Sequence, residues 1–155
     1  MSAPYEEILD GRTVLRLPPG ARHEAVCARL HALVNASVAN VKSTCLLAPR
    51  TRVRLSANHA VCPDLALVTA ATGKLWLAAE IVDSDDHGTD TVVKKAIYEE
   101  IRVPRLWMVD PRYDNLEVYH GNEYGLALKE IMAGSEVLTE SLLPELQVAI
   151  REFFA

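Results

Sequence analysis

Three short apolar stretches in the middle of the sequence most limit how this chain can fold. They cover residues 64–70, 75–82 and 105–110. Apolar runs of this length are typical of strands, and the third is apolar enough for a strand buried on both faces of a sheet. Residues 90–102 carry apolar side chains at helical spacing, a pattern that ends at Val103-Pro104. The segment therefore predicts three strands, with a helix before the third.

Three polar side chains interrupt this apolar segment. Asp64 and Glu80 lie in predicted strands, and Lys94 lies on the predicted helix. A carboxylate in a buried strand is costly unless it is paired or binds a cation. Two such carboxylates on neighbouring strands, with an ammonium group nearby, are typical of a site for a hard metal ion with a lysine beside its water. The alternative is structural: Asp64 caps the entrance of its strand and Glu80 pairs with Lys94.

The N-terminal half predicts a hairpin followed by a helix. Asp10-Gly11 is a typical two-residue turn, and the flanking residues 5–9 and 13–17 have strand character. Residues 21–40 carry apolar side chains at helical spacing and predict an amphipathic helix. Beyond that helix, we predict strands at 41–48 and 51–55 and a loop at 56–62.

The C-terminal part predicts a second hairpin and a last helix. Residues 116–120 and 124–131 flank a turn at Gly121-Asn122 and are expected to pair antiparallel. Pro144 is favoured in the first turn of a helix, so the last helix is expected to begin there. That helix would bury Leu146, Ile150 and either Phe153 or Phe154.

Residues 83–90, which read D-S-D-D-H-G-T-D, are polar and acidic. The segment lacks the later glutamate of an EF-hand calcium loop, so a solvated loop is predicted. Thr89 or Asp90 is expected to cap the helix that follows.

The predicted first helix carries several candidate ligand residues. His23, Cys27 and His31 recur at i, i+4 and i+8, but no fourth ligand of a soft-metal site can be identified. Glu24 lies in the first turn, where the helix dipole favours an acidic side chain. These residues are therefore expected to serve the structure, although Glu24 is also a candidate carboxylate for a site at the sheet.

Length and composition favour one globular domain over residues 1–155. No stretch reaches the roughly 18 apolar residues of a transmembrane helix, and the first ten residues do not resemble a signal peptide. Cys27, Cys45 and Cys62 share no C-x-x-C spacing, which favours reduced thiols. We therefore expect a cytoplasmic protein that makes no contact with a membrane.

The formal net charge of −5 argues against a general nucleic-acid-binding domain. Such domains usually carry a strongly basic face, because neutralising phosphates supplies much of the affinity. Contact with nucleic acid would therefore depend on a local basic patch, for which Arg50, Arg52 and Arg54 are candidates.

The order of predicted elements fits an α/β or α+β fold, with a mixed β-sheet flanked by helices and a hairpin near each end. Several motifs then resemble the Uma2 family of restriction-endonuclease-like proteins. These motifs are Pro63-Asp64, Glu80-x-Val82, Asp90-x-x-x-Lys94-x-x-x-Tyr98 and V-P-R-L-W-M-V-D-P over 103–111. The N-terminal Y-E-E-I-L-D-G, the helix that opens with His23 and the C-terminal L-P-E-L are also similar, so the resemblance covers nearly the whole chain.

The resemblance implies a PD-(D/E)xK nuclease core that binds Mg²⁺ or Mn²⁺. Asp64 and Glu80 would be the carboxylate ligands, joined by the backbone carbonyl of Ile81, with Glu24 as a further carboxylate. The lysine expected two residues after the glutamate is replaced by Val82, and in this family it comes from the following helix, where Lys94 stands.

Lys94 and Tyr98 are four residues apart, so both side chains can reach the sheet, whereas Lys95 is expected in solvent. The implied catalytic set is Asp64, Glu80, Lys94 and Tyr98.

The sequence is compatible with two functions. The first is a divalent-metal-dependent nuclease acting on DNA or RNA. The second is a non-catalytic binding or regulatory module that retains the fold; it is favoured by the acidic 83–90 segment, which differs from the S-P-S-T and basic residues of relatives and would repel a polyanion. A homodimer or higher homo-oligomer is also predicted, with Trp107 and the 116–131 hairpin as candidate contacts, although burial of Trp107 in a core strand is the stronger prediction.

Overall fold

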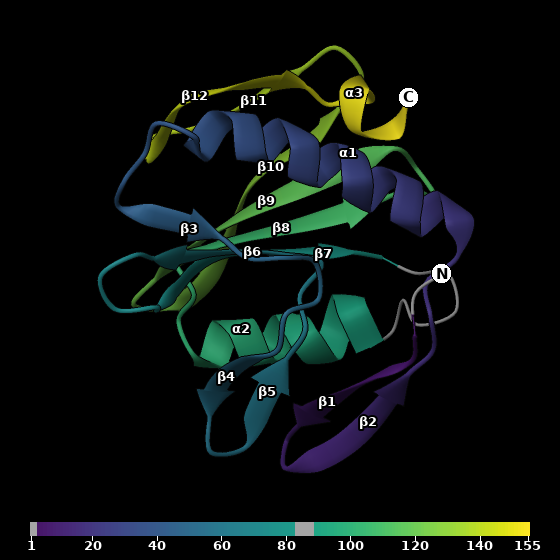
Figure 1. Cartoon of the computed structure of the whole chain (residues 1–155), viewed down its shortest axis with the longest axis vertical. Helices are drawn as coiled ribbons and strands as arrows, with labels where there is room; N and C mark the ends of the chain where they lie inside the picture. Colours follow the sequence, from purple (N-terminus) through teal and green to yellow (C-terminus); the bar gives the residue numbers. More distant parts are fainter. Residues whose placement is uncertain (1–2, 83–88) are drawn as a thin grey trace.

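The computed structural model describes residues 3–82 and 89–155, and a six-stranded mixed sheet lies at its centre (Figure 1). The strand order is β10-β9-β8-β7-β6-β3, with β7 and β8 parallel and every other neighbouring pair antiparallel. The strands are β3 (Thr44–Leu46), β6 (Leu65–Thr69), β7 (Leu75–Ile81), β8 (Arg105–Asp110), β9 (Asn115–Asn122) and β10 (Gly125–Ala133). The predicted mixed sheet is confirmed.

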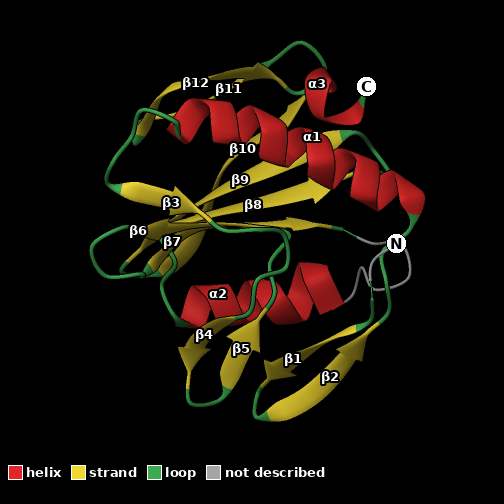
Figure 2. Cartoon of the chain, in the orientation of Figure 1, coloured by secondary structure: helices red, strands yellow, loops and turns green. Residues whose placement is uncertain are grey.

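Helices cover both faces of this sheet (Figure 2). A π-helical turn, η1 (Thr89–Lys94), and helix α2 (Lys95–Glu100) connect the parallel strands β7 and β8 on one face. Helix α1 (Ala21–Val38) lies on the other face.

Residues 83–88 and the side chains of residues 89–91 lie outside the described part. The structure therefore does not test the predicted acidic loop or the predicted cap at Thr89 or Asp90.

Alternate residues of β7 divide the core into two layers. Ala79 and Ile81 belong to the apolar cluster beneath α1, whereas Ala78 and Val82 belong to the cluster beneath α2. Successive side chains of a strand point to opposite faces, so Glu80 shares the face of Ala78 and Val82. The carboxylate of Glu80 is therefore directed towards the helix that carries Lys94.

A second sheet lies beyond α2, on the side away from the six-stranded sheet (Figure 1). Its order is β2-β1-β5-β4, made by β1 (Tyr5–Leu9), β2 (Arg12–Arg16), β4 (Val53–Ser56) and β5 (His59–Val61). The turn between β1 and β2 has positive φ at Asp10 (54°) and Gly11 (77°), as a two-residue hairpin turn requires. Leu9 and Val61 of this sheet share the apolar cluster of α2.

Strand β5 corrects the predicted loop over 56–62. His59, Ala60 and Val61 are all buried, and Ala60 pairs with both Ile8 and Arg54. A strand of three residues, preceded by polar turn residues, is too short to show a period. Only its position between β1 and β4 makes it a strand.

The predicted C-terminal helix from Pro144 is wrong. Residues Leu143–Ala149 form β12, which pairs antiparallel with β11 (Val137–Glu140), and the only helix there is α3 (Arg151–Phe154). Leu146 and Val148 are buried while Gln147 is exposed, which is the period of a strand. The predicted burial of Leu146, Ile150 and one of the two phenylalanines is nevertheless confirmed, because β12 and α3 pack against α1; both Phe153 and Phe154 are buried.

Candidate functional site

Asp64 and Glu80 lie side by side at one end of the six-stranded sheet. Leu65 pairs with Ala79 in the antiparallel β6–β7 ladder, and the next step of the same register places Asp64 opposite Glu80. Asp64 is 3% exposed and Glu80 is 2% exposed. Two carboxylates are thus buried side by side at the ends of neighbouring strands, as the sequence predicts.

The Asp64 carboxylate accepts bonds from two directions. Its Oδ2 accepts the backbone N–H of Ile81 at 2.8 Å, and its Oδ1 accepts Nη1 of Arg50 at 3.1 Å. The other guanidinium nitrogen, Nη2, lies 2.8 Å from Oε1 of Glu24, so Arg50 bridges the two carboxylates. His23 Nε2 lies 3.4 Å from Oδ2 of Asp64.

These contacts decide the charge of Asp64. Burial by itself would raise the pKa of Asp64, but the hydrogen bond and charge of His23, the Ile81 N–H and the charge of Lys94 outweigh it and lower that pKa. Asp64 is therefore an ionised carboxylate at neutral pH, which is the state that a metal ion requires.

The histidine and cysteine stripe of α1 faces Asp64. The Cys27 thiol donates to the Asp64 carbonyl oxygen at 3.7 Å, and His31 Nε2 lies 2.6 Å from the same oxygen and donates to it. Burial and the charge of Asp64 raise the pKa of Cys27 to about 12, so Cys27 is a thiol rather than a thiolate. The stripe positions Asp64 and is unsuited to a soft metal.

Glu80 meets both helical residues that the sequence places beside it. Lys94 Nζ lies 2.7 Å from Glu80 Oε2, and the Tyr98 hydroxyl donates to the same oxygen at 2.6 Å. Lys94 is 1% exposed and Tyr98 is fully buried. Burial, then the adjacent Glu80 charge, raises the pKa of Tyr98 well above its usual value, so the phenol keeps its proton and remains a donor.

Glu7 completes the cluster and was missed in the sequence. Its Oε2 lies 2.7 Å from Lys94 Nζ and accepts the backbone N–H of Cys62 at 2.7 Å, while its Oε1 accepts Nη1 of Arg16 at 2.6 Å. Glu7 is completely buried. Two adjacent glutamates, Glu6 and Glu7, occupy β1, and their side chains point to opposite faces of the strand. Which of the two is buried depends on how the hairpin docks on α2, so the sequence did not single out Glu7.

Carboxylates outnumber permanent cations in this cluster. Among the described residues it holds four carboxylates and three permanent cations, and the imidazole of His23 adds positive charge beside Asp64. The carboxylates belong to Glu7, Glu24, Asp64 and Glu80, and the cations are Arg16, Arg50 and Lys94. Carboxylate oxygens are the donors that Mg²⁺ and Mn²⁺ prefer, so the chemistry of the donor set fits a divalent cation.

Other residues considered in the sequence lie outside this cluster. Arg52 and Arg54 are exposed, whereas Arg50 lies within the site. Lys95 is half-buried rather than solvated, with Nζ 4.4 Å from the ring centroid of Tyr119. Each of the three cysteines is a free thiol, as predicted.

Asp10, His59 and Glu100 form a second group of possible metal ligands. The backbone N–H of Asp10 donates to His59 Nδ1 at 3.1 Å, so the ring proton lies on Nε2, which is 3.1 Å from Glu100 Oε2. A metal ion at Nε2 would have to displace that proton. With both ring nitrogens engaged in this way, the group is a hydrogen-bonded link between the β1–β2 turn and α2.

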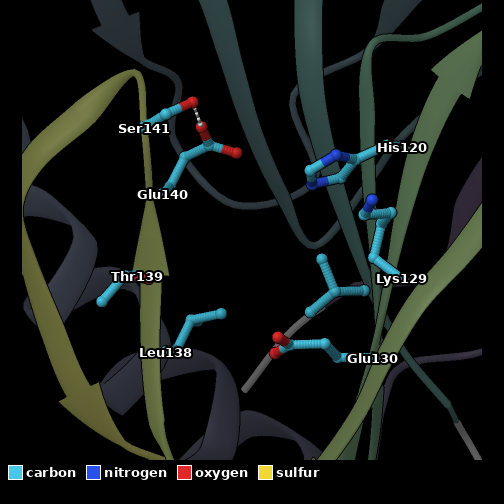
Figure 3. Close-up of a pocket in the computed structure, with 8 residues that line it drawn as sticks. His120, Lys129, Glu130, Leu138, Thr139, Glu140 and Ser141 are labelled. Carbon is cyan, nitrogen blue, oxygen red and sulfur yellow. Dashed lines mark hydrogen bonds between the residues drawn. The ribbon is translucent and has the colours of Figure 1, made fainter.

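A cavity of about 220 Å³ lies between β9, β10 and β11 (Figure 3). The cavity is near Arg105, at the start of β8. Ile81 lies beside the other end of β8, where it pairs with Val109. The buried Glu140 in its wall is satisfied by Arg105 Nε at 2.6 Å, the Leu142 N–H at 2.9 Å and the Ser141 hydroxyl at 3.1 Å. The cavity is therefore separate from the Asp64–Glu80 cluster, and its buried carboxylate is already occupied.

Comparisons with known proteins agree with this fold. The model of the Uma2 family, described as "Putative restriction endonuclease", matches residues 3–151. A crystal structure of a putative nuclease belonging to DUF820 from Anabaena variabilis superposes with a TM-score of 0.81, covering 99% of this chain and 91% of that one. At 16% sequence identity, this likeness concerns the fold. Comparison with curated proteins finds no match.

Proposed function

Since this chain belongs to the Uma2 family, we propose that it is a divalent-metal-dependent nuclease that hydrolyses phosphodiester bonds in DNA or RNA. The observation that carries this proposal is the buried pair Asp64 and Glu80, with Lys94 Nζ 2.7 Å from Glu80. The structure titled "putative nuclease" in the comparison shares the fold of this chain.

In this proposal the ligands of Mg²⁺ or Mn²⁺ are the carboxylates of Asp64 and Glu80 and the backbone carbonyl of Ile81. Glu24, linked to Asp64 through Arg50, is a further carboxylate within the same cluster. A divalent cation in such a site lowers the pKa of its bound water and stabilises negative charge on the phosphate.

The remaining residues orient these groups. The Ile81 N–H and Arg50 fix the two oxygens of Asp64, and Tyr98 fixes Oε2 of Glu80. In this proposal Lys94, whose Nζ lies 2.7 Å from Glu80 Oε2, would donate a hydrogen bond to the attacking water and thereby position it. Val82 is buried beneath α2, so the helix supplies the ammonium group that a lysine at this strand position would otherwise provide.

The non-catalytic alternative gains no support from the comparisons, since both the family description and the named structural relative concern nucleases. The acidic 83–90 segment, which motivated that alternative, lies mostly outside the described residues.

Calorimetric titration of Mn²⁺ tests the metal site directly. We expect wild-type protein to bind Mn²⁺ at millimolar concentrations or below, and Asp64→Asn to abolish that binding. The matched control is Asp114→Asn, because the Asp114 side chain is 61% exposed and lies in a surface pair with Arg22. Equal, weak binding by wild type and Asp64→Asn would reject the site.

A cleavage screen with single- and double-stranded DNA and RNA then tests the activity. Lys94→Met should remove cleavage while retaining Mn²⁺ binding, because it removes the group that orients water and leaves the carboxylates. Cleavage that survives both Asp64→Asn and Lys94→Met would assign the activity to other residues.

Location and assembly are also part of the proposal. Among the described residues, no helix is long and apolar enough to cross a membrane. We propose a cytoplasmic homodimer or higher homo-oligomer whose contact includes the β9–β10 hairpin, where Leu128 and Ile131 are exposed. Trp107 is 1% exposed, which confirms its predicted burial and removes it as a contact residue. Sedimentation velocity showing only monomers at high concentration would reject this assembly.

A further inference from the structure

Glu7 reaches the candidate site from a different sheet than Asp64 and Glu80 do. It lies on β1 of the four-stranded sheet, and its Oε2 is 2.7 Å from Lys94 Nζ. Lys94 Nζ is also 2.7 Å from Oε2 of Glu80. One buried ammonium group is thus shared equally between a proposed metal ligand and a carboxylate that belongs to another layer of the fold.

The surroundings of Glu7 keep it in place without Lys94. Arg16 donates to Oε1 of Glu7 from the neighbouring strand, and the N–H of Cys62 holds Oε2, the oxygen that faces Lys94. Stability alone gives little reason to bury such a network, because an apolar side chain in place of a buried ion pair is often at least as stabilising. Position 7 lies near the apolar cluster of Leu9 and Val61, where an apolar residue would pack well.

A cation bound to Glu80 would weaken the attachment of Lys94 to that carboxylate, and Glu7 can keep Lys94 in place. Divalent positive charge on Glu80 repels the Lys94 ammonium, and it also competes for the carboxylate that binds Lys94. The second carboxylate retains Lys94 beside the site under those conditions. Its negative charge also adds to the attraction that the site exerts on a cation.

We propose that Glu7 is a positioning residue that holds Lys94 beside Glu80 both with and without a bound cation, and that it strengthens cation binding by its charge. The anchoring of Lys94 is independent of the proposed nuclease function, whereas the effect on cation binding rests on it. Two measurements separate these parts.

The first measurement needs no metal. Acetic anhydride labelling of the folded protein, read by mass spectrometry, reports how often Lys94 leaves its buried position. Glu7→Gln preserves the shape but removes the charge, so Lys94 should be labelled several-fold faster than in wild type. Glu6→Gln, an exposed neighbour on the same strand, is the matched control and should leave labelling unchanged. Labelling of Lys94 at the wild-type rate in Glu7→Gln would overturn the anchoring role.

The second measurement is Mn²⁺ affinity by calorimetry, with the cleavage rate under saturating Mn²⁺. Glu7→Gln should weaken Mn²⁺ binding roughly tenfold and lower kcat, because a buried negative charge near the cation is lost. Glu7→Asp retains the charge with a shorter side chain and should restore most of the affinity. Wild-type affinity and kcat in folded Glu7→Gln would overturn the effect on the site.

Misfolding is addressed by a double variant. Should Glu7→Gln fail to fold, Glu7→Gln combined with Arg16→Gln removes both charges together and leaves no unpaired buried guanidinium. Faster Lys94 labelling in the folded double variant supports the anchoring role, and protection equal to wild type contradicts it. Wild-type protein that neither binds Mn²⁺ nor cleaves would reject the nuclease function, while labelling still decides whether Glu7 anchors Lys94.

Discussion

Tyr98→Phe should destabilise this protein by removing one buried hydrogen bond and little else. The Tyr98 hydroxyl donates to Oε2 of Glu80 at 2.6 Å, and both residues are almost inaccessible to solvent. A hydrogen bond to a charged group contributes about 1.5–3 kcal/mol to the free energy of unfolding. With about 2.1 cal/mol/K per residue, the unfolding entropy of 155 residues is about 0.33 kcal/mol/K, so Tm should fall by about 5–9 °C.

Thermal unfolding followed by circular dichroism, together with urea unfolding at pH 7, measures this effect. Tyr124→Phe is the matched control, because Tyr124 is 90% exposed and its hydroxyl has no partner among the described residues. Its Tm should remain within about 1 °C of wild type, since exposed substitutions rarely exceed about 0.5 kcal/mol. A loss below about 0.5 kcal/mol in Tyr98→Phe would show that the phenol does not contribute to the stability of the Glu80 cluster.

Three further predictions test the electrostatics and packing around the site. The folded-state pKa of Asp64 lies below its usual value of 3.8. The ionised carboxylate therefore stabilises the fold above about pH 5, and this stabilisation is lost as pH falls through the folded pKa. In Asp64→Asn, the midpoint of urea unfolding should fall less steeply than in wild type as the solution is acidified. Gly121→Ala should lower the free energy of unfolding in urea by about 1–3 kcal/mol, because a Cβ there would lie 2.3 Å from the Val103 carbonyl oxygen. Gly20→Ala is the control and should lower it less, since a Cβ at position 20 meets nothing within 4 Å. Leu146→Ala should cost about 2–5 kcal/mol, since Leu146 is 1% exposed in the core beside α1; a cost below 1 kcal/mol would contradict that packing.

The central strands and helices could be predicted because their residues repeat over enough positions to show a period. The 18 residues of α1 and the seven residues of β7 carry strong local patterns, and both were predicted within a few residues of their observed ends. β5 has three residues, which is too few for a pattern. β12 begins with Leu143-Pro144, a pair that also suits the start of a helix, and its pairing with β11 made it a strand.

Part of the candidate site was also accessible from local reasoning. Asp64 and Glu80 were identifiable because ionisable side chains within apolar strands are costly, and Lys94 and Tyr98 because residues four apart on a helix share a face. The contacts of Lys94 and Tyr98 with Glu80 match that prediction. Their catalytic roles remain a proposal.

The partners of these residues depend on segments that are distant in the sequence. Glu7 is separated from Lys94 by more than half the length of the chain, and its carboxylate reaches the site only because the hairpin β1–β2 docks beneath α2. Arg50 and His23 meet Asp64 through the packing of α1 and the β3–β4 connection. Local periodicity assigns a side chain to a face of its own element, whereas a contact between elements depends on the relative placement of both. Strand and helix character, and the presence of buried charge, are therefore local properties of this sequence, but the arrangement of that charge around Lys94 exists only in the folded protein.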